Sequence, residues 1–88
     1  MTSAAAWAVY LLRCGDGTLY CGIALDVEGR LAQHREGKGA KYTRGRGPLE
    51  LVYKEVCGTK GQALRRERQI KRLRRAEKHR LCGLPPSR

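Results

Sequence analysis

Two short apolar stretches near the start of the chain flank a turn signal. Residues 7–14 and residues 18–23 are rich in aromatic, β-branched and aliphatic side chains, and Gly15-Asp16-Gly17 separates them. Glycine permits positive φ and aspartate tolerates a tight turn, so this pattern predicts a β-hairpin. We expect the rest of the chain to be organised around that hairpin.

The length of the hairpin loop decides where two tyrosines point. A three-residue loop pairs Tyr10 with Gly22 and puts Tyr20 on the same face, diagonal to Tyr10. A two-residue loop would send the tyrosines to opposite faces, because a shift of one residue inverts every side chain. Since Gly22 has no side chain, we expect the space in front of Tyr10 to stay open for a ligand. The alternative interpretation makes both tyrosines core aromatics.

A helix is predicted over residues 27–35. Asp26 is a good N-cap residue, and two glycines soon after the stretch end the helical pattern. Arg30 and His34 are four residues apart, so they are neighbours on the helix surface. The stripe that we expect to dock on the sheet consists of Val27, Leu31 and His34.

A third strand and a second helix follow a glycine-rich loop. Residues 49–57 have a strand pattern, and Thr59 can cap a helix that we expect to run from Lys60 to about Arg75. A further short helix is expected over residues 76–81. The inward stripe of the longer helix consists of Ala63, Leu64, Ile70 and Leu73.

Glu67 lies inside that apolar stripe, on a helix whose other faces are basic. An unpaired ionised carboxylate is costly to bury, so its position needs a reason. One explanation is a salt bridge to Lys71, one turn further on. The other is a cavity at the edge of the stripe, where Glu67 holds a cation. The helix alone does not decide between them.

The net charge of the chain is the strongest indication of its binding partner. The 88 residues carry a formal net charge of +11 with a pI near 10.2, and a chain of this length suits one domain. So dense a positive field favours a polyanion, most simply nucleic acid. Residues 37–48 contain no acidic side chain and set a tyrosine among lysines and arginines, a mixture that binds phosphates and stacks on bases. The alternative is a solvated loop. The expected nucleic-acid-binding residues are Lys38, Lys41, Tyr42, Arg44 and Arg46 in this loop and Arg68, Lys71 and Arg72 on the second helix.

Other features of the sequence indicate the location of the protein, the state of its cysteines and the extent of its folded domain. No apolar run reaches the roughly 20 residues needed to span a bilayer, and the first residues lack the features of a secretory signal, so we expect a cytoplasmic protein with no membrane partner. The four cysteines have no Cys-x-x-Cys spacing and the chain has only two histidines, which argues against a zinc site, and the expected compartment favours reduced thiols over disulfides. We expect residues 1–6 to be a flexible N-terminus, residues 7–82 to be the folded domain, and residues 83–88 to be a flexible C-terminal tail.

Five residues carry chemistry that fits one reaction: Tyr10, Tyr20, Arg30, His34 and Glu67. Together they meet the demands of phosphodiester hydrolysis. A lone carboxylate with phosphate oxygens can hold Mg²⁺, and water on such an ion is a better nucleophile near neutral pH. A tyrosine hydroxyl can position or deprotonate that water, an arginine can stabilise charge on phosphorus, and a histidine can relay a proton.

The order of these residues resembles the GIY-YIG nuclease domain. Ala8-Val9-Tyr10 stands at the first tyrosine triplet and Tyr20-Cys21-Gly22 at the second, with Arg30 and His34 on the next helix and Glu67 on a later one. The chain is most similar to the small stand-alone bacterial proteins of this family. The resemblance implies an α+β fold, with a three-stranded antiparallel sheet flanked by helices. It also implies cleavage of DNA that depends on a single Mg²⁺ or Mn²⁺ ion.

The resemblance also implies roles. Tyr10 matches a candidate general base, and Tyr20 matches the tyrosine that helps align water and phosphate, but the sequence does not decide which of them takes the proton. Arg30 matches the arginine that steadies the transition state. His34 occupies a position where relatives carry His or Tyr, and Glu67 matches the metal-binding glutamate.

The chain departs from the family pattern at several positions. Both triplets keep the tyrosine, and the second keeps its last glycine, Gly22, as a structural residue of the site, but the remaining positions differ from Gly-Ile-Tyr and Tyr-Ile-Gly. Where some relatives carry a lysine just after the second triplet, this chain has Ile23, which removes one candidate for lowering a tyrosine pKa. No separate DNA-reading domain is attached, so we expect weak sequence preference. A preference for branched, nicked or flapped DNA stays open, as do a protein partner that supplies recognition and the oligomeric state.

Two classes of function follow. The first is a metal-dependent endonuclease in DNA repair or processing. The second is a non-catalytic DNA- or RNA-binding module that uses the nuclease fold as a basic scaffold, since positive charge does not separate DNA from RNA. The intact set of Tyr10, Tyr20, Arg30 and Glu67 favours the first.

Overall fold

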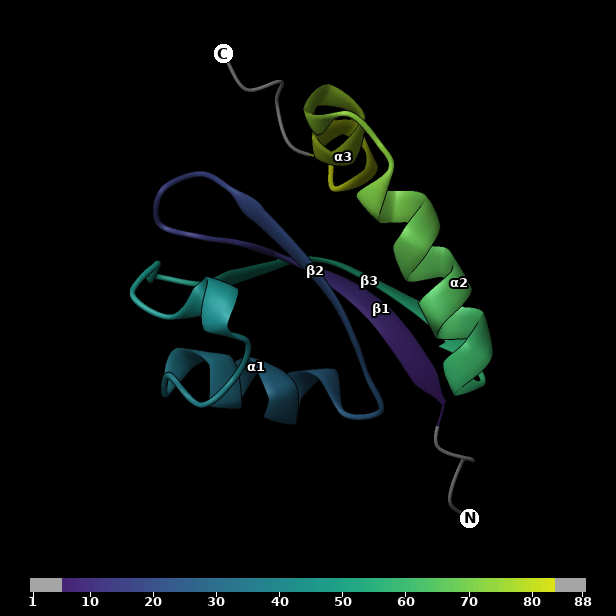
Figure 1. Cartoon of the computed structure of the whole chain (residues 1–88), viewed down its shortest axis with the longest axis horizontal. Helices are drawn as coiled ribbons and strands as arrows, with labels where there is room; N and C mark the ends of the chain where they lie inside the picture. Colours follow the sequence, from purple (N-terminus) through teal and green to yellow (C-terminus); the bar gives the residue numbers. More distant parts are fainter. Residues whose placement is uncertain (1–5, 84–88) are drawn as a thin grey trace.

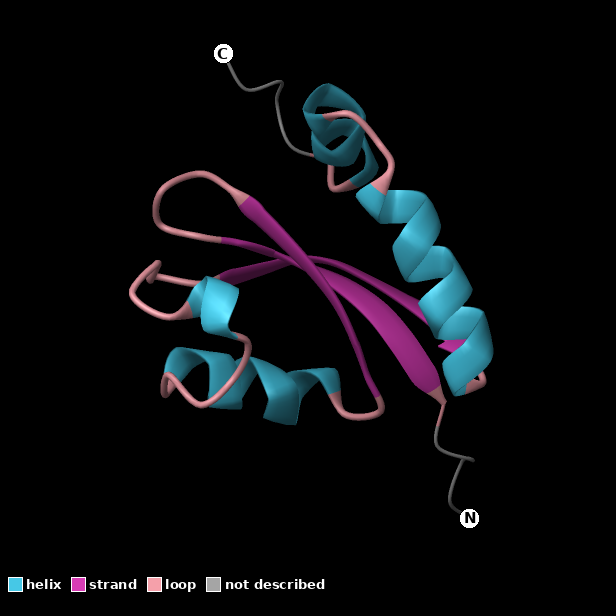
Figure 2. Ribbon diagram, viewed as in Figure 1, coloured by secondary structure: helices cyan, strands magenta, loops and turns pink. Residues whose placement is uncertain are grey.

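The computed structural model describes residues 6–83, in which strands and helices follow one another along the chain (Figure 1). The elements are β1 (Trp7–Arg13), β2 (Leu19–Ala24), α1 (Val27–Arg35), the 3₁₀ helix η1 (Lys41–Thr43), β3 (Glu50–Gly58), α2 (Lys60–Lys71) and α3 (Arg75–Leu81). The three strands form one antiparallel sheet in the order β2-β1-β3, with helices on both sides of it (Figure 2). This α+β architecture confirms the predicted fold class.

The ends of the predicted elements shift by small amounts. The third strand, predicted over residues 49–57, begins and ends one residue later. The two ends of the chain that were expected to be flexible, residues 1–6 and 83–88, lie outside the described residues except for Ala6 and Gly83. Within residues 6–83, no helix has the length and apolar character needed to cross a membrane.

The hairpin has the predicted three-residue loop. The backbone N–H of Cys14 donates to the carbonyl of Thr18 at 2.8 Å, and the Asp16 side chain accepts from the Thr18 hydroxyl at 2.6 Å. In the resulting register Tyr10 lies opposite Gly22. Both tyrosines of the hairpin therefore share one face of the sheet, as the three-residue loop predicts.

The sheet has a separate hydrophobic cluster on each face, because β1 is central and buried on both sides. Figure 1 shows α1 on one side of the sheet and α2 on the other. The cluster on the first side, here called the α1-side cluster, includes Ala8, Tyr10, Leu12, Val27 and Leu31. The cluster on the second side, the α2-side cluster, includes Val9, Leu11, Cys21 and Ile70.

Both longer helices begin at side-chain caps. The Asp26 carboxylate accepts the N–H of Gly29 at 3.1 Å at the start of α1, as predicted. Thr59 and Gln62 form a reciprocal capping box at the start of α2. The predicted stripe of α1 is confirmed, because its three side chains are the buried ones: Val27, Leu31 and His34.

The prediction that the second helix reaches Arg75 is wrong. The helix α2 ends at Lys71, and the chain turns before α3 begins at Arg75 rather than at the expected Ala76. The Glu77 carboxylate accepts the backbone N–H of Arg74 at 2.8 Å and thereby caps the start of α3. No glycine or proline marks this break, so the helical pattern continues through it.

The basic loop over residues 37–48 is fastened to the hairpin turn. The Gly15 N–H donates to the Arg46 carbonyl at 2.5 Å, and the Arg46 guanidinium pairs with the Asp16 carboxylate at 2.5 Å. The same guanidinium lies 4.4 Å from the centre of the Tyr42 ring. The loop has no acid of its own, and the carboxylate that pairs with Arg46 comes from the hairpin.

Candidate active site

The candidate residues gather around the free edge of the sheet at β2. Because β2 is an edge strand, side chains from both of its faces reach the same edge. A cavity of about 230 Å³ shows this directly, since Tyr20 of the α1 side and Cys21 of the α2 side both line it, together with Lys71 from α2. The edge therefore joins groups that the sheet otherwise separates.

Tyr10 and His34 form a buried pair on the α1 side. The Tyr10 hydroxyl lies 2.8 Å from His34 Nε2, and the two residues are 1% and 2% exposed. The Ala40 N–H donates to His34 Nδ1 at 3.2 Å, and an amide N–H cannot accept. Nδ1 is therefore the unprotonated nitrogen, so Nε2–H donates to the Tyr10 oxygen.

Burial sets the protonation of this pair. Burial raises the pKa of Tyr10 to about 12, with Tyr20 adding to the rise and the Arg30 guanidinium opposing it. Burial also lowers the pKa of His34, and the nearby Arg30 charge lowers it further. Near neutral pH the pair consists of a neutral phenol and a neutral imidazole.

Gly22 is required by close packing rather than by an open space. A Cβ atom at this position would lie 2.6 Å from the Tyr10 hydroxyl oxygen and 3.1 Å from Cε2 of Tyr20. The expectation that the space in front of Tyr10 stays open for a ligand is therefore wrong, because the tyrosine itself fills it. Glycine lets the two aromatic side chains approach the strand.

Tyr20 is the more accessible of the two tyrosines. Its ring stacks on Tyr42 with 5.8 Å between centroids and meets His34 edge-on at 5.3 Å. Burial raises the pKa of Tyr20, the positive charges of Lys71 and Arg30 oppose the rise, and Glu67 adds to it. Tyr20 is only partly buried and lines the 230 Å³ cavity, so a molecule bound there would contact it.

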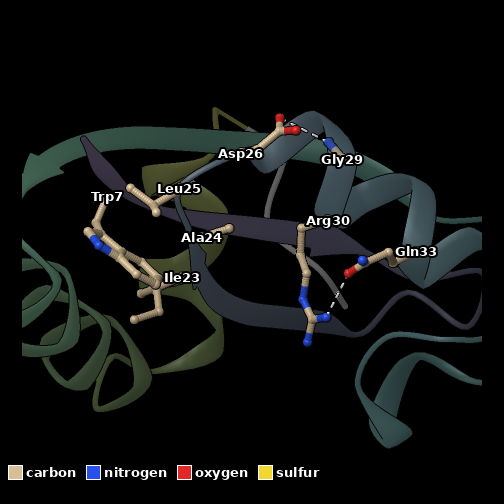
Figure 3. Close-up of a pocket in the computed structure, with 8 residues that line it drawn as sticks. All are labelled: Trp7, Ile23, Ala24, Leu25, Asp26, Gly29, Arg30 and Gln33. Atoms are coloured by element: carbon tan, nitrogen blue, oxygen red, sulfur yellow. Dashed lines mark hydrogen bonds between the residues drawn. The ribbon is translucent and has the colours of Figure 1, made fainter. Parts of the chain in front are cut away.

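Arg30 lines a second cavity at the same edge, of about 390 Å³. Figure 3 shows Trp7 and Ile23 on one side of it and Arg30 with Gln33 on the other. The Arg30 guanidinium donates to the Gln33 side-chain oxygen at 2.9 Å. This bond orients the guanidinium, whose other N–H groups remain as donors for a ligand.

Glu67 lies on α2 beside Lys71, whose Nζ is 3.4 Å from a Glu67 carboxylate oxygen. The Glu67 side chain is only 17% exposed and that of Lys71 is 55% exposed. This is the salt bridge named above as the first explanation for Glu67. The carboxylate also acts on the β2 edge, since its charge contributes to the raised pKa values of Tyr20 and Cys21.

The donor set at this edge suits only a metal ion that the substrate helps to hold. Among residues 6–83, no three His, Cys, Asp or Glu side chains come together as a ready-made metal site. Mg²⁺ is commonly bound by one or two carboxylates, with substrate phosphates and water completing its octahedron. The partly buried carboxylate of Glu67 fits that arrangement.

The thiol of Cys21 is not a reactive group of the site. Burial raises its pKa to about 11, and the negative charge of Glu67 adds to the rise. The nucleophilic form of cysteine is the thiolate, which is scarce under these conditions. Cys21 instead packs in the α2-side cluster.

The predicted nucleic-acid-binding residues are dispersed over two surfaces. Four of those in the basic loop are exposed, whereas Arg46 is held by Asp16 and Tyr42. Glu36 lies 3.6 Å from the Lys38 ammonium. The exposed members are Lys38, Lys41, Tyr42 and Arg44 in the loop and Arg68, Lys71 and Arg72 at the end of α2.

Sequence reasoning missed four residues near the site. Thr43 lies 3.0 Å from His34 Nδ1, and Gln33 holds Arg30. Arg75 and Lys78 of α3 line cavities beside β2. Gln33 stands three residues after Arg30, a spacing at which helix neighbours meet, so it was the one with a local signal.

The chain is similar to known proteins over nearly all of its length. Residues 6–80 match the family model of the GIY-YIG catalytic domain. A UPF0213 protein from Natronomonas pharaonis is 54% identical over 75 residues, which cover 85% of this chain and 88% of the relative. A UPF0213 protein from Serratia liquefaciens is 49% identical over 80 residues, which cover 91% of this chain and 78% of the relative.

Two solution NMR structures share the fold. A UPF0213 protein from Bacillus halodurans matches with a TM-score of 0.57 at 44% identity, covering 92% of this chain and 86% of that chain. A protein from E. faecalis matches with a TM-score of 0.60 at 31% identity, covering 94% and 90%. The family match includes each of the five residues that carry the candidate chemistry.

Proposed function

The chain belongs to the GIY-YIG family of nuclease domains, and on that premise we propose that it is a metal-dependent endonuclease that hydrolyses DNA phosphodiester bonds. One observation carries the proposal. Tyr10 and Tyr20 lie 6.3 Å apart between ring centroids on the α1 side of the sheet, and Tyr20, at the β2 edge, is within reach of the charges of both Arg30 on α1 and Glu67 on α2. An edge of this kind is open to a long polymer, whereas an enclosed cavity is not.

Each side chain has a distinct task in the proposed reaction. Tyr20, which is accessible, accepts a hydrogen bond from the attacking water and aligns it with phosphorus. Arg30 donates to the phosphate oxygens as negative charge builds on them. Tyr10, at 1% exposure, cannot reach the water, so it acts as a positioning residue that His34 holds against Gly22.

Glu67 is the proposed protein ligand of a single Mg²⁺ or Mn²⁺ ion. A divalent ion held there supplies positive charge to the phosphate and lowers the pKa of water. The salt bridge to Lys71 engages one carboxylate oxygen of Glu67, so an ion would bind at the other oxygen or compete with Lys71. Lys71 is the more exposed partner and has a flexible stem, so it is free to move toward a phosphate instead.

We also propose the extent of the nuclease unit, its DNA preference, its location and its need for a partner. We assign residues 7–82 as the nuclease unit, with weak sequence preference and selection by DNA structure in repair or processing. A cytoplasmic location and a protein partner that supplies recognition belong to the same proposal.

A second candidate function is a binding module for DNA or RNA that has lost catalysis. The observation that favours it is the salt bridge between Glu67 and Lys71, because a positive charge beside the carboxylate opposes the binding of a cation there. Binding without cleavage in the presence of Mg²⁺ or Mn²⁺ would support this candidate.

Cleavage of labelled DNA and RNA structures with Mg²⁺, Mn²⁺ or EDTA tests the proposal. We expect metal-dependent cleavage that Glu67→Gln abolishes, while duplex binding stays within a few-fold. Arg30→Ala should lower turnover by about 100-fold or more, as the loss of one transition-state donor does. Glu28→Gln removes an exposed carboxylate from α1 and serves as the matched control.

Two outcomes would overturn the proposal. One is equal cleavage by the wild type and Glu67→Gln in preparations free of host nuclease. The other is a change of less than threefold for Arg30→Ala.

A further inference from the structure

Two adjoining cavities form a trough that leads away from Tyr20. The 230 Å³ cavity beside Tyr20 and a neighbouring one of about 190 Å³ share Leu19 and Lys78 in their walls. We call the joined cavities the Lys78 trough. Besides Leu19, its walls include Tyr20, Tyr42, Lys71, Arg75 and Lys78.

The charge of the trough is positive and unbalanced. Its lining includes three cationic side chains and no carboxylate. Lys71 has Glu67 as a salt-bridge partner, but within the described part of the chain Arg75 and Lys78 have none. Arg46 provides the contrast, since Asp16 already neutralises it. A cation without a partner on a concave surface is ready to bind an anion.

The break between α2 and α3 creates this arrangement. Arg75 is the first residue of α3, and one of its guanidinium nitrogens is 3.9 Å from the position of a Cβ on Gly17, in the hairpin loop. A helix that continued straight from α2 would not place Arg75 and Lys78 against the start of β2. The turn therefore serves to bring α3 to the hairpin.

We propose that the Lys78 trough binds the backbone phosphates next to the scissile phosphate on the cleaved strand. This inference rests on the proposed function, because it takes Tyr20 as the position of the reaction. Lys71 and Lys78 serve the phosphate nearest to Tyr20, and Arg75 serves the one beyond it. Tyr42, which is stacked on Tyr20 and covered by the Arg46 guanidinium, forms the wall of the trough next to the reaction centre.

Binding and turnover of Lys78→Ala and Arg75→Ala test this assignment. Arg80→Ala is the matched control, because Arg80 is an exposed cation on α3 that does not line the trough. Binding of a fluorescent oligonucleotide in EDTA is followed by anisotropy across a range of salt concentrations. Each trough variant should reduce the slope of log K against log salt by about 0.7 for a single strand or about 0.9 for a duplex, and Arg80→Ala should not.

A second measurement locates the contact along the strand. Oligonucleotides with one neutral methylphosphonate at successive positions are compared with the unmodified strand. The wild type should bind a strand less tightly when the neutral group replaces a phosphate beside the cleavage site. At the phosphate that Lys78 contacts, Lys78→Ala should bind the modified and unmodified strands equally well. In turnover assays Lys78→Ala should raise KM and leave kcat within about threefold.

The outcomes separate this inference from the proposed function. Cleavage that needs Glu67, with equal effects of Lys78→Ala and Arg80→Ala, would overturn the trough and leave the nuclease intact. A wild type that never cleaves, but whose binding depends on Lys78 and Arg75 and not on Arg80, would overturn the nuclease and keep the trough as a phosphate site.

Discussion

Tyr10→Phe removes one buried oxygen atom and leaves the aromatic ring in place. Tyr10 is 1% exposed, and its hydroxyl accepts from His34 Nε2 across 2.8 Å. The substitution leaves that N–H buried without a partner, which costs roughly 1–3 kcal/mol. In a domain of this size, each kcal/mol lowers Tm by about 4–8 °C.

Urea unfolding at pH 7.5 measures this loss directly. The chain has one tryptophan, Trp7 at the start of β1, so its fluorescence reports on the sheet, and far-UV circular dichroism supplies the second probe. Tyr42→Phe is the matched control because Tyr42 is 41% exposed. Its free energy of unfolding should stay within about 0.5 kcal/mol of the wild type.

A double-mutant cycle with His34→Leu isolates the pair itself. If the hydroxyl and the imidazole act together, the two substitutions should show a coupling energy of at least about 0.5 kcal/mol. A loss below about 0.5 kcal/mol for Tyr10→Phe, together with zero coupling, would refute the hydrogen bond and the tautomer assigned to His34. Equal destabilisation by Tyr42→Phe would show that the loss of any tyrosine hydroxyl lowers the free energy of unfolding by this amount.

Two further predictions concern the same region. Burial and the charge of Arg30 lower the pKa of His34 in the folded protein. As the pH falls, the unfolded chain therefore binds the His34 proton at a higher pH than the folded chain does. The free energy of unfolding should therefore fall as pH drops below about 6.5, by up to about 1.4 kcal/mol per pH unit, and His34→Gln should lack this contribution in urea titrations between pH 8 and pH 5. Equal slopes would contradict the assignment. Gly22→Ala should lose about 1–3 kcal/mol by the same assay, because its Cβ would lie 2.6 Å from the Tyr10 oxygen. Gly47→Ala, whose Cβ meets nothing within 4 Å, should lose much less, and a Gly22→Ala variant as stable as Gly47→Ala would show that the aromatic pair can retreat.

The sequence predicted those parts of the fold whose signals are local. Gly15-Asp16-Gly17 fixes the loop length, and the loop length fixes the register that pairs Tyr10 with Gly22. Asp26 fixes the start of α1, and the spacing of its apolar residues fixes which face docks. In each case a few neighbouring residues determine the local structure, so the local sequence pattern is enough to predict it.

Two of the missed features depend on residues far apart in the chain, and a third depends on a local cap that the pattern did not reveal. The salt bridge of Arg46 needs Asp16, which lies 30 residues earlier. The burial of the Tyr10 hydroxyl depends on where α1 carries His34 after the chain has folded back. The end of α2 depends on the cap that Glu77 provides, and no residue at the break itself signals it.

The two hydrophobic clusters have a consequence for how this centre can change over time. The two tyrosines pack in or against the α1-side cluster, whereas α2, which carries Glu67, is anchored by Ile70 in the α2-side cluster. Substitutions in the α2-side cluster can shift Glu67 while the Tyr10–His34 pair keeps its geometry. Substitutions in the α1-side cluster can likewise shift that pair and leave Glu67 in place. If Glu67 holds an ion and the tyrosines align the substrate, as proposed, substitutions in one cluster would alter one of these properties and leave the other in place.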